Sequence, residues 1–420
     1  MIDLLINDIL GEPAILVGLF AFIGLIIQRK SFSDIIQGTL KTLMGFLVLG
    51  AGAGVVVGTL NSFGEMFTYA FGIEGTIPNT QAAAGIVQIA FGTETALIML
   101  FGMVINIMIA RFTKWKYIFL TGHHTLAMAA MLAVVLAVGG ISGIPLVILG
   151  SIVLGIWMVA SPAMIQKYVV QITKRDDIAI GHFASIGYLV SAATGSLVGN
   201  KEKSTEDIKA PKSLDFLRDY IIMVALTMII MFVVIALVAG QSFVEGYVSG
   251  GINYIFFSFM QGLLFASGVF VLMEGVKMIL DHIIPAFKGI ADKVIPNAKP
   301  ALDIPALFPY APNAVIVGFL TTFIAGLVMM VLLPIFGLVV VIPGLVSVFF
   351  AGGGAGVFGN AAGGRRGAVI GAFVSGLLLG FLPALLIPVL GEMGYVGTTF
   401  QDQDYGIIGS IIGYFLRIFN

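Results

Sequence analysis

Apolar runs of about 20 residues, separated by short polar segments, follow one another along almost the whole chain. A helix of that length spans the hydrocarbon core of a bilayer, which is roughly 30 Å thick. The pattern therefore predicts an all-α polytopic membrane protein with about eleven transmembrane helices. The predicted spans lie at about 13–28, 34–60, a third that ends near 111, 117–138, 145–164, 221–240, 253–276, 312–334, 338–358, 367–390 and 405–419.

Two segments depart from this pattern. Residues 178–198 (AIGHFASIGYLVSAATGSLVG) are short and rich in small residues, and we interpret them as an amphipathic or re-entrant hairpin rather than a span. Residues 200–219 carry many charges and are predicted to form a cytoplasmic linker. The expected organisation is a first half at 1–199, the linker at 200–219, a second half at 220–390 and a C-terminal transmembrane helix at 391–420.

The basic residues predict the orientation of the spans. Lysine and arginine gather in loops between alternate apolar runs, and loops with such clusters stay in the cytoplasm. The clusters lie at 29–30, 111–116, 167–175, 277–299 and 365–366, with Arg417 near the end. We therefore expect the N-terminus outside and the C-terminus inside.

The composition excludes several classes of protein. Hydrophobic residues make up 59% of the 420 positions and charged residues 10%, whereas soluble domains carry about a quarter charged residues. The formal net charge of −1 provides no basic bias for nucleic acid. The chain has no cysteine, which excludes disulfides, thiolate metal sites and a cysteine nucleophile. The first apolar run follows acidic residues, so no signal peptide is predicted.

One tripeptide indicates internal symmetry. Ile77-Pro78-Asn79 recurs as Ile295-Pro296-Asn297, and each copy follows an amphipathic stretch. The charge pattern places the first copy outside and the second inside. Related elements on opposite faces are typical of an inverted repeat, in which substrate binds near the midplane between discontinuous helices.

Polar side chains in the predicted spans are candidate functional residues, since ionisable groups are costly in hydrocarbon. His123 and His124 are adjacent at the start of the span at 117–138. They lie about 100° apart around a helix, so one is expected to face a cavity and the other to pack. His182 occupies the predicted hairpin at 178–198. Each could equally be a structural histidine, hydrogen-bonded within the bundle.

Three further residues each have more than one interpretation. Asp303 lies between prolines, where a helix cannot continue. Its carboxylate could accept hydrogen bonds from substrate hydroxyls, or from backbone N–H groups as a cap. Thr80 has the same two possible roles. Glu94, at the start of a span, could be a cap, a cation site or an interfacial residue.

Neither of the two glycine-rich stretches predicts a nucleotide site. Residues 50–58 continue an apolar helix without a ribose-binding acid downstream, and are expected to pack closely through Gly54 and Gly58. Residues 351–367 lack the Lys-Ser/Thr ending of a phosphate-binding loop and are expected to be flexible or closely packed. The four histidines are too few and too dispersed to predict a zinc site. No metal, cofactor or catalytic residue is therefore predicted.

Several motifs, taken in order along the chain, indicate a family. They are RKSFSDIIQGTLKTLMGF (29–46), GTIPNT (75–80), LTGH (120–123), IGH (180–182), KEKSTEDIKAP (201–211), APNAV (311–315) and GVFGNAAGGRRGA (356–368). Together they resemble the enzyme IIC permease of the L-ascorbate branch of the bacterial phosphotransferase system, over nearly the whole chain.

This resemblance implies a homodimeric, multi-pass transport protein of the bacterial inner membrane, not an enzyme. Each protomer would have a substrate-holding core domain, which moves like an elevator, and a V-shaped domain for the dimer contact. A separate phosphorylated enzyme IIB would modify the transported ascorbate-like molecule. Matched position by position, the substrate contacts would be Thr80, His123, His182 and Asp303, with His124 packing.

Two matched positions differ from the family pattern, because Ala127 and Phe183 stand where glutamines are expected. Each lost amide hydrogen bond is worth on the order of 1 kcal/mol, so a related small sugar acid, lactone or pentitol is a possible substrate. The alternative is an ion-coupled secondary transporter, in which Glu94 or Asp303 would bind Na⁺ or H⁺. A membrane-embedded enzyme is disfavoured because no nucleophile–base set is evident.

Overall fold

The computed structural model describes residues 13–72, 75–76, 78–208, 216, 219–395 and 398–419. It is 80% helical, which confirms the predicted class of helical membrane protein. The helices are α1 (Pro13–Ile27), α2 (Phe32–Phe71), α3 (Thr80–Phe112), α4 (Gly122–Val138), α5 (Gly143–Thr173), α6 (Ser185–Val198), α7 (Tyr220–Ala239), α8 (Gln241–Phe243), α9 (Tyr254–Val294), α10 (Pro312–Leu332), α11 (Leu345–Arg366), α12 (Ala372–Val389) and α13 (Gln403–Phe419). The strands are β1 (Tyr117–Phe119), β2 (Ala179–Ile180) and β3 (Lys299–Leu302), and the short helical turns are η2 (Thr205–Asp207), η4 (Val244–Val248), η5 (Ile304–Tyr310), η6 (Leu333–Phe336), η7 (Gly367–Gly371) and η8 (Gly391–Tyr395).

Six helices in the described part of the chain are long and apolar enough to cross a membrane, or seven if one bent pair counts as a span. The bent pair is Val224–Ala239 with Gln241–Val248, at 100°. The six are Phe32–Phe71, Ala90–Phe112, Gly143–Thr173, Tyr254–Val271, Pro312–Phe336 and Val346–Val389. The expected number of about eleven crossings stays a prediction. Helix α6 has 14 residues, about 21 Å, and is too short to span, as expected for 178–198.

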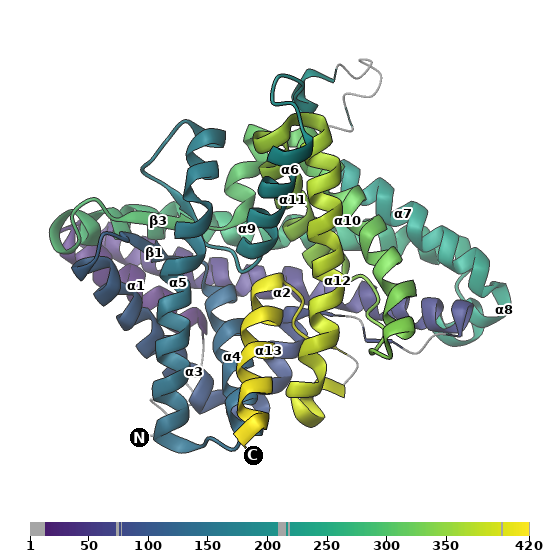
Figure 1. Ribbon diagram of the computed structural model, residues 1–420, viewed down its shortest axis with the longest axis horizontal. Coiled ribbons are helices and arrows are strands. Elements are labelled where there is room, and N and C mark those ends of the chain that lie inside the picture. Colours follow the sequence, from purple (N-terminus) through teal and green to yellow (C-terminus); the bar gives the residue numbers. More distant parts are fainter. Residues whose placement is uncertain are drawn as a thin grey trace.

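The longest helices are α2 and α9, with 40 and 41 residues. Each is about 60 Å long, twice the thickness of the hydrocarbon core. They pack against each other and, with α1 and α7, form one group of helices. Helices α3–α6 and α10–α13 pack mainly among themselves and form a second group (Figure 1). The second group carries the polar cluster described below.

Helix α4 lies at the centre of this second group, next to α13 (Figure 1). All its residues from Ala127 to Leu136 are buried. They contact apolar side chains of α3, α5, α12 and α13. Because residues 127–136 are buried on every side, this part of α4 presents no face to solvent or lipid and is stabilised by contacts with the surrounding helices. The polar start of α4, with its two histidines, is therefore held at a fixed place inside the bundle.

The three strands form one small parallel sheet in the order β1-β3-β2. The apolar pattern predicts a span from residue 117, but Tyr117–Phe119 is a strand and α4 begins only at Gly122. An apolar tripeptide has the same pattern in either element, so the sequence does not distinguish them. The pairing satisfies backbone N–H and C=O groups that a broken segment would leave open inside the protein.

Side chains from neighbouring elements hold this sheet at the edge strand β1 and at the start of the central strand β3. The Asn106 amide of α3 donates to the Tyr117 carbonyl (3.0 Å) and accepts from the Phe119 N–H (3.1 Å), which satisfies the open edge of β1. At the start of β3, Lys299 forms an ion pair with Asp176 in the loop between α5 and β2. The hydrogen bond from Lys299 lowers the pKa of Asp176. The strands are thus fixed relative to α3 and α5.

Glycines bring α6, α11 and η7 into backbone contact. A Cβ at Gly363 would collide with the Gly195 carbonyl of α6, and one at Gly359 with the Gly367 carbonyl. Helix α11 breaks at Gly363 and Gly364, where Gly364 has a φ of 61°. The close packing expected for residues 351–367 is therefore confirmed.

The close packing expected through Gly54 and Gly58 is wrong within this chain. A Cβ at Gly50, Gly54 or Gly58 would meet no atom within 4 Å. These three glycines lie four residues apart and share one exposed face of α2. The partners of α2 in the chain contact its other faces, so this glycine face, Gly50–Gly54–Gly58, has no neighbour among the described residues.

The beginning of the charged linker folds onto the second group. Ser204 caps the short turn η2. The Glu206 carboxylate then accepts hydrogen bonds from the backbone N–H groups of Asn313 (3.2 Å) and Ala314 (2.9 Å). These groups lie in the first turn of α10, where a negative charge is favourable. Residues 201–203 are exposed, as predicted for a charged linker in solvent. Residues 209–215 and 217–218 of the predicted linker lie outside the described part.

Candidate functional site

The sheet brings three of the predicted site residues to one place. Strand β1 leads to His123, β2 to His182 and β3 to Asp303, each within four residues of the strand's carboxyl end. The carboxyl ends of parallel strands meet at the same edge of a sheet, and ligands bind beside that edge in open α/β sheets. Residues of β1 and β2 are each paired with residues of β3 that lie 120 residues or more away in sequence. The sheet thus brings distant segments together.

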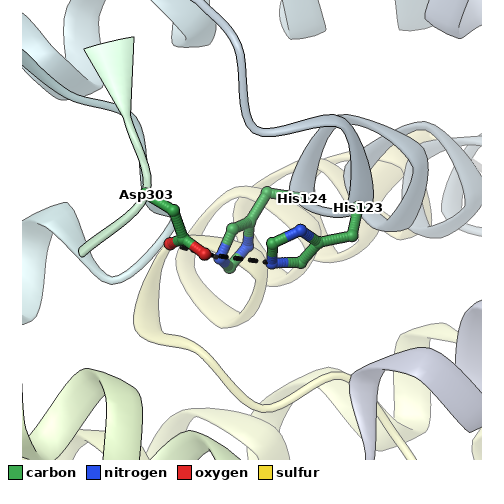
Figure 2. A group of neighbouring side chains, drawn as sticks. All are labelled: His123, His124 and Asp303. Atoms are coloured by element: carbon green, nitrogen blue, oxygen red, sulfur yellow. Dashed lines mark ion pairs between the residues drawn. The ribbon is translucent and has the colours of Figure 1, made fainter. Parts of the chain in front are cut away.

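The Asp303 carboxylate points toward the imidazoles of His123 and His124 (Figure 2), and His182 lies near it as well. One of its oxygens lies 3.6 Å from Nε2 of His123, and the other lies 4.0 Å from Nε2 of His124 and 3.9 Å from Nε2 of His182. Each distance exceeds that of a direct hydrogen bond. Among the described residues, the Asp303 carboxylate accepts a short hydrogen bond from the Ile304 N–H, 2.7 Å away, at the start of η5. Asp303 therefore combines the two expected arrangements, because its carboxylate caps η5 and also faces the histidines.

The start of α13 closes the cluster from another side. The Tyr405 hydroxyl lies 2.7 Å from Nδ1 of His124, and an Asp402 oxygen lies 3.8 Å from the same nitrogen. The neighbouring Asp404 has a different role, because its carboxylate accepts from Ser185, the Ile186 N–H and the Trp157 indole. A buried carboxylate with three donors holds α13 against α5 and α6. Asp402 is thereby positioned beside the histidines.

Hydrogen bonds to His182 indicate its tautomer. Its Nδ1 accepts from the Ala184 N–H at 3.2 Å, and the Tyr188 hydroxyl lies 3.1 Å from the same atom. A neutral imidazole that accepts at Nδ1 carries its proton on Nε2. His182 therefore presents an N–H donor toward Asp303.

His124 has the opposite arrangement. The Tyr405 hydroxyl can donate to the His124 carbonyl, 3.5 Å away, and then accepts from Nδ1. The proton is then on Nδ1, and Nε2 presents a lone pair. This Nε2 is buried and makes no hydrogen bond with the described residues, and the same holds for Oδ1 of Asp402. Both atoms are open to a ligand.

Three predicted site residues lie beside the cluster rather than in it. The Thr80 hydroxyl accepts from the Gln401 N–H at 3.2 Å, one residue before Asp402. Phe183 is fully buried and stacks on Phe119, with ring centroids 4.6 Å apart. Ala127 is buried in α4. The two positions expected to hold glutamine therefore belong to the apolar core that supports His124.

One expectation about the histidines is incomplete and another is wrong. His124 is buried and packs against Tyr405 of α13, but it does not only pack, since it and His123 both approach Asp303 (Figure 2). The carboxylate approaches the first turn of α4, so both side chains can reach it although they point 100° apart. Nor are the histidines dispersed, because His123, His124 and His182 lie together, with ring centroids 4.5 and 4.0 Å apart.

The sequence misses the acidic residues of α13. The segment QDQDYG (401–406) precedes an apolar run and has the pattern of an interfacial loop, but Asp402 and Asp404 are buried. Glu94 and Asp303 are therefore not the only buried candidates for ion binding. Glu94 itself is half-buried in an apolar groove between α3 and α5. A signal was present, because acidic residues beside a membrane span are unusual and often functional.

Ionisable groups buried at helix breaks inside a helical bundle are typical of membrane transport proteins, and the fold and the cluster define this class. A model of the PTS (phosphotransferase system) sugar-specific permease component matches residues 8–404, and the chain belongs to this family. The members are transport components rather than catalytic enzymes. The protein is accordingly a multi-pass protein of the bacterial plasma membrane.

One relative carries a more specific name. The chain is 26% identical over 439 residues to the ascorbate-specific PTS system EIIC component of Mycoplasma pneumoniae (strain ATCC 29342 / M129 / Subtype 1). The match covers 91% of this chain and 65% of the relative, so the chain spans less than two thirds of the relative's length. The resemblance predicted from the motifs is confirmed at the level of the family.

Proposed function

We propose that the chain is an enzyme IIC permease that carries L-ascorbate, or a related small sugar acid, lactone or pentitol, across the membrane. The observation that supports this most strongly is the convergence of His123, His182 and Asp303 at the ends of three strands. Their distances of 3.6 and 3.9 Å leave the polar atoms without direct hydrogen bonds to one another. Each side chain therefore retains a donor or acceptor for a solute.

The donors and acceptors suit a hydroxylated molecule. A hydroxyl group donates and accepts at once, so it can donate to Asp303 and accept from the Nε2–H of His182. The first turn of α4 adds a favourable potential for an anion such as ascorbate. We assign Thr80, His123, His182 and Asp303 as substrate contacts. Ala127 and Phe183, in place of two glutamines, make the pocket less polar than the family pattern, which favours a substrate with fewer groups to satisfy.

Movement of the substrate by an elevator mechanism is part of the proposal. The two groups of helices would serve as the V-shaped domain (α1, α2, α7 and α9) and the core domain. The long helices α2 and α9 have nearly equal lengths, and the copies of Ile-Pro-Asn follow each of them at 77–79 and 295–297. This correspondence supports an inverted repeat with halves at 1–199 and 220–390.

The composition supports coupling by a second protein. The chain has no cysteine to carry a phosphoryl group. We therefore propose that a phosphorylated enzyme IIB, on a separate chain, transfers the phosphoryl group to the substrate at the cytoplasmic side.

Uptake into sealed vesicles tests this coupling. We expect accumulation of phosphorylated substrate only when phosphorylated IIB is enclosed, because translocation alone cannot concentrate a solute. A panel of labelled ascorbate, pentitols and sugar acids would identify the preferred substrate. Accumulation driven by a sodium or proton gradient without IIB would contradict the proposal. It would support the alternative, an ion-coupled secondary transporter in which Asp303 or Asp402 binds the ion.

We also propose that two copies of the chain form a homodimer. The resemblance implies it, and the exposed glycine face of α2 offers a surface on which another helix can pack closely. Because the chain lacks cysteine, a Gly54→Cys variant has a single thiol. Oxidation in membranes should link two copies of this variant. An Ile148→Cys variant, with the thiol on the exposed face of α5, should form no disulfide between the two copies. Equal linking of both variants would argue against this contact.

A further inference from the structure

Two carboxylates and three imidazoles meet in the candidate site, and among the described residues no lysine or arginine forms an ion pair with these carboxylates. Two overlapping sets of three residues have ligand atoms within 4.8 Å of one another. One is His123, His124 and Asp303, and the other is His124, His182 and Asp402. In the described part of the chain, the charged partners of Asp303 are these histidines.

The tautomers favour the first set. Nε2 of His182 carries a proton when Nδ1 accepts from Ala184, so it is a donor and not a metal ligand in that state. Nε2 of His124 instead presents a lone pair toward an oxygen of Asp303, 4.0 Å away. Two acceptors that face each other in a buried site need a cation or a donor between them. A buried nitrogen without a hydrogen bond is consistent with this requirement.

From this geometry we infer that His123, His124 and Asp303 form a binding site for a divalent transition-metal ion. In a tetrahedral zinc site with Zn–N distances of 2.0–2.1 Å, ligand atoms lie about 3.4 Å apart. Here the two imidazole nitrogens lie 3.6 and 4.0 Å from different oxygens of Asp303, and one ligand atom from each residue lies within 4.8 Å of the others. Rotations of the side chains would bring the three ligand atoms to the spacing of a zinc site. Two imidazoles, one carboxylate and an open fourth position match zinc sites that bind a further oxygen ligand.

The surroundings have the features that orient metal ligands. A ligating histidine usually has a partner for its other ring nitrogen, and Nδ1 of His124 has the Tyr405 hydroxyl at 2.7 Å. A ligating carboxylate is usually hydrogen-bonded as well, and Asp303 accepts from the Ile304 N–H. The inference goes beyond the proposed function, because it holds whichever solute the protein carries.

The test is metal binding by the purified full-length chain in detergent, after treatment with a chelator. We expect one Zn²⁺ per chain by calorimetric titration and by metal analysis after gel filtration. His123→Ala and Asp303→Asn should each weaken binding at least 10-fold. The matched control is His282→Ala, which removes a histidine from α9, a helix that contributes no residue to the described cluster. Its affinity should equal that of the wild type.

Equal binding by the wild type and both cluster variants, or no stoichiometric binding by the wild type, would overturn the inference. If a variant fails to fold, the stoichiometry measured on the wild type still decides the question. X-ray absorption of the zinc-loaded protein should show imidazole ligands at about 2.0–2.1 Å, and a shell of water oxygens alone would also overturn it. Since the readout is metal binding, its failure leaves the vesicle uptake result, and hence the proposed function, unaffected.

Discussion

Replacement of Asp303 by asparagine is expected to reduce vesicle uptake at least 100-fold while the protein still folds. The carboxylate faces three imidazoles and would accept hydrogen bonds from the substrate. Hydrogen bonds to a charged group are worth about 1.5–3 kcal/mol each, and about 3 kcal/mol corresponds to about 100-fold in affinity. Asparagine keeps the oxygen that accepts from the Ile304 N–H, so the start of η5 should be preserved.

His123→Ala should give a loss of similar size, because His123 is the least buried of the three histidines, with its side chain 19% exposed, and is the most open to a solute. Initial uptake rates and direct binding of labelled substrate are the measurements. Glu202→Gln serves as a matched control, since Glu202 is an exposed acid outside the cluster. Unchanged uptake in both site variants, with normal gel-filtration profiles, would show that the substrate binds elsewhere.

The site was predictable from the sequence where a polar residue interrupts an apolar run. His123, His182 and Asp303 satisfy that condition, and the structure brings them together. The strands that do so were not predictable, because YIF (117–119) and AI (179–180) have the pattern of apolar helix starts. Pairing between segments so distant in sequence leaves no local signal.

Other errors have equally specific causes. The 100° step of a helix predicts that His124 packs, which it does, but not that it also approaches Asp303, because a partner at the helix end can be reached from more than one face. Asp402 was overlooked because polar residues before a span resemble an interfacial loop. The glycines at 50–58 and at 351–367 have similar spacing, yet Gly54 and Gly58 meet no neighbour among the described residues, whereas Gly359 and Gly363 are in backbone contact. Spacing predicts that a face can pack closely, but not which partner it meets.

Gly363→Ala is expected to cause the largest loss of stability among single substitutions by alanine. The new Cβ would collide with the backbone carbonyl and Cα of Gly195 in α6. A flexible side chain could move aside, but these are main-chain atoms within a helix. Insertion of a methyl group into a packed core costs about 1–3 kcal/mol, and occasionally more, and we expect about 3 kcal/mol here.

The collision would also disturb the linker and the substrate site. The Gly363 carbonyl accepts from the Asn200 N–H at 2.9 Å, and α6 begins at Ser185, which donates to Asp404 beside the cluster. We therefore expect Gly363→Ala to lower the apparent melting temperature in detergent and to weaken substrate binding as well.

Gly92→Ala in α3 is the matched control, since a Cβ there would meet no atom within 4 Å. Alanine is favoured over glycine in a helix by up to about 1 kcal/mol, so this variant should melt at or above the wild-type temperature. If Gly363→Ala melted together with Gly92→Ala, the backbones of α6 and α11 could not be in direct contact. The site would then lack the rigid support that holds Asp404, and through it Asp402, beside the histidines.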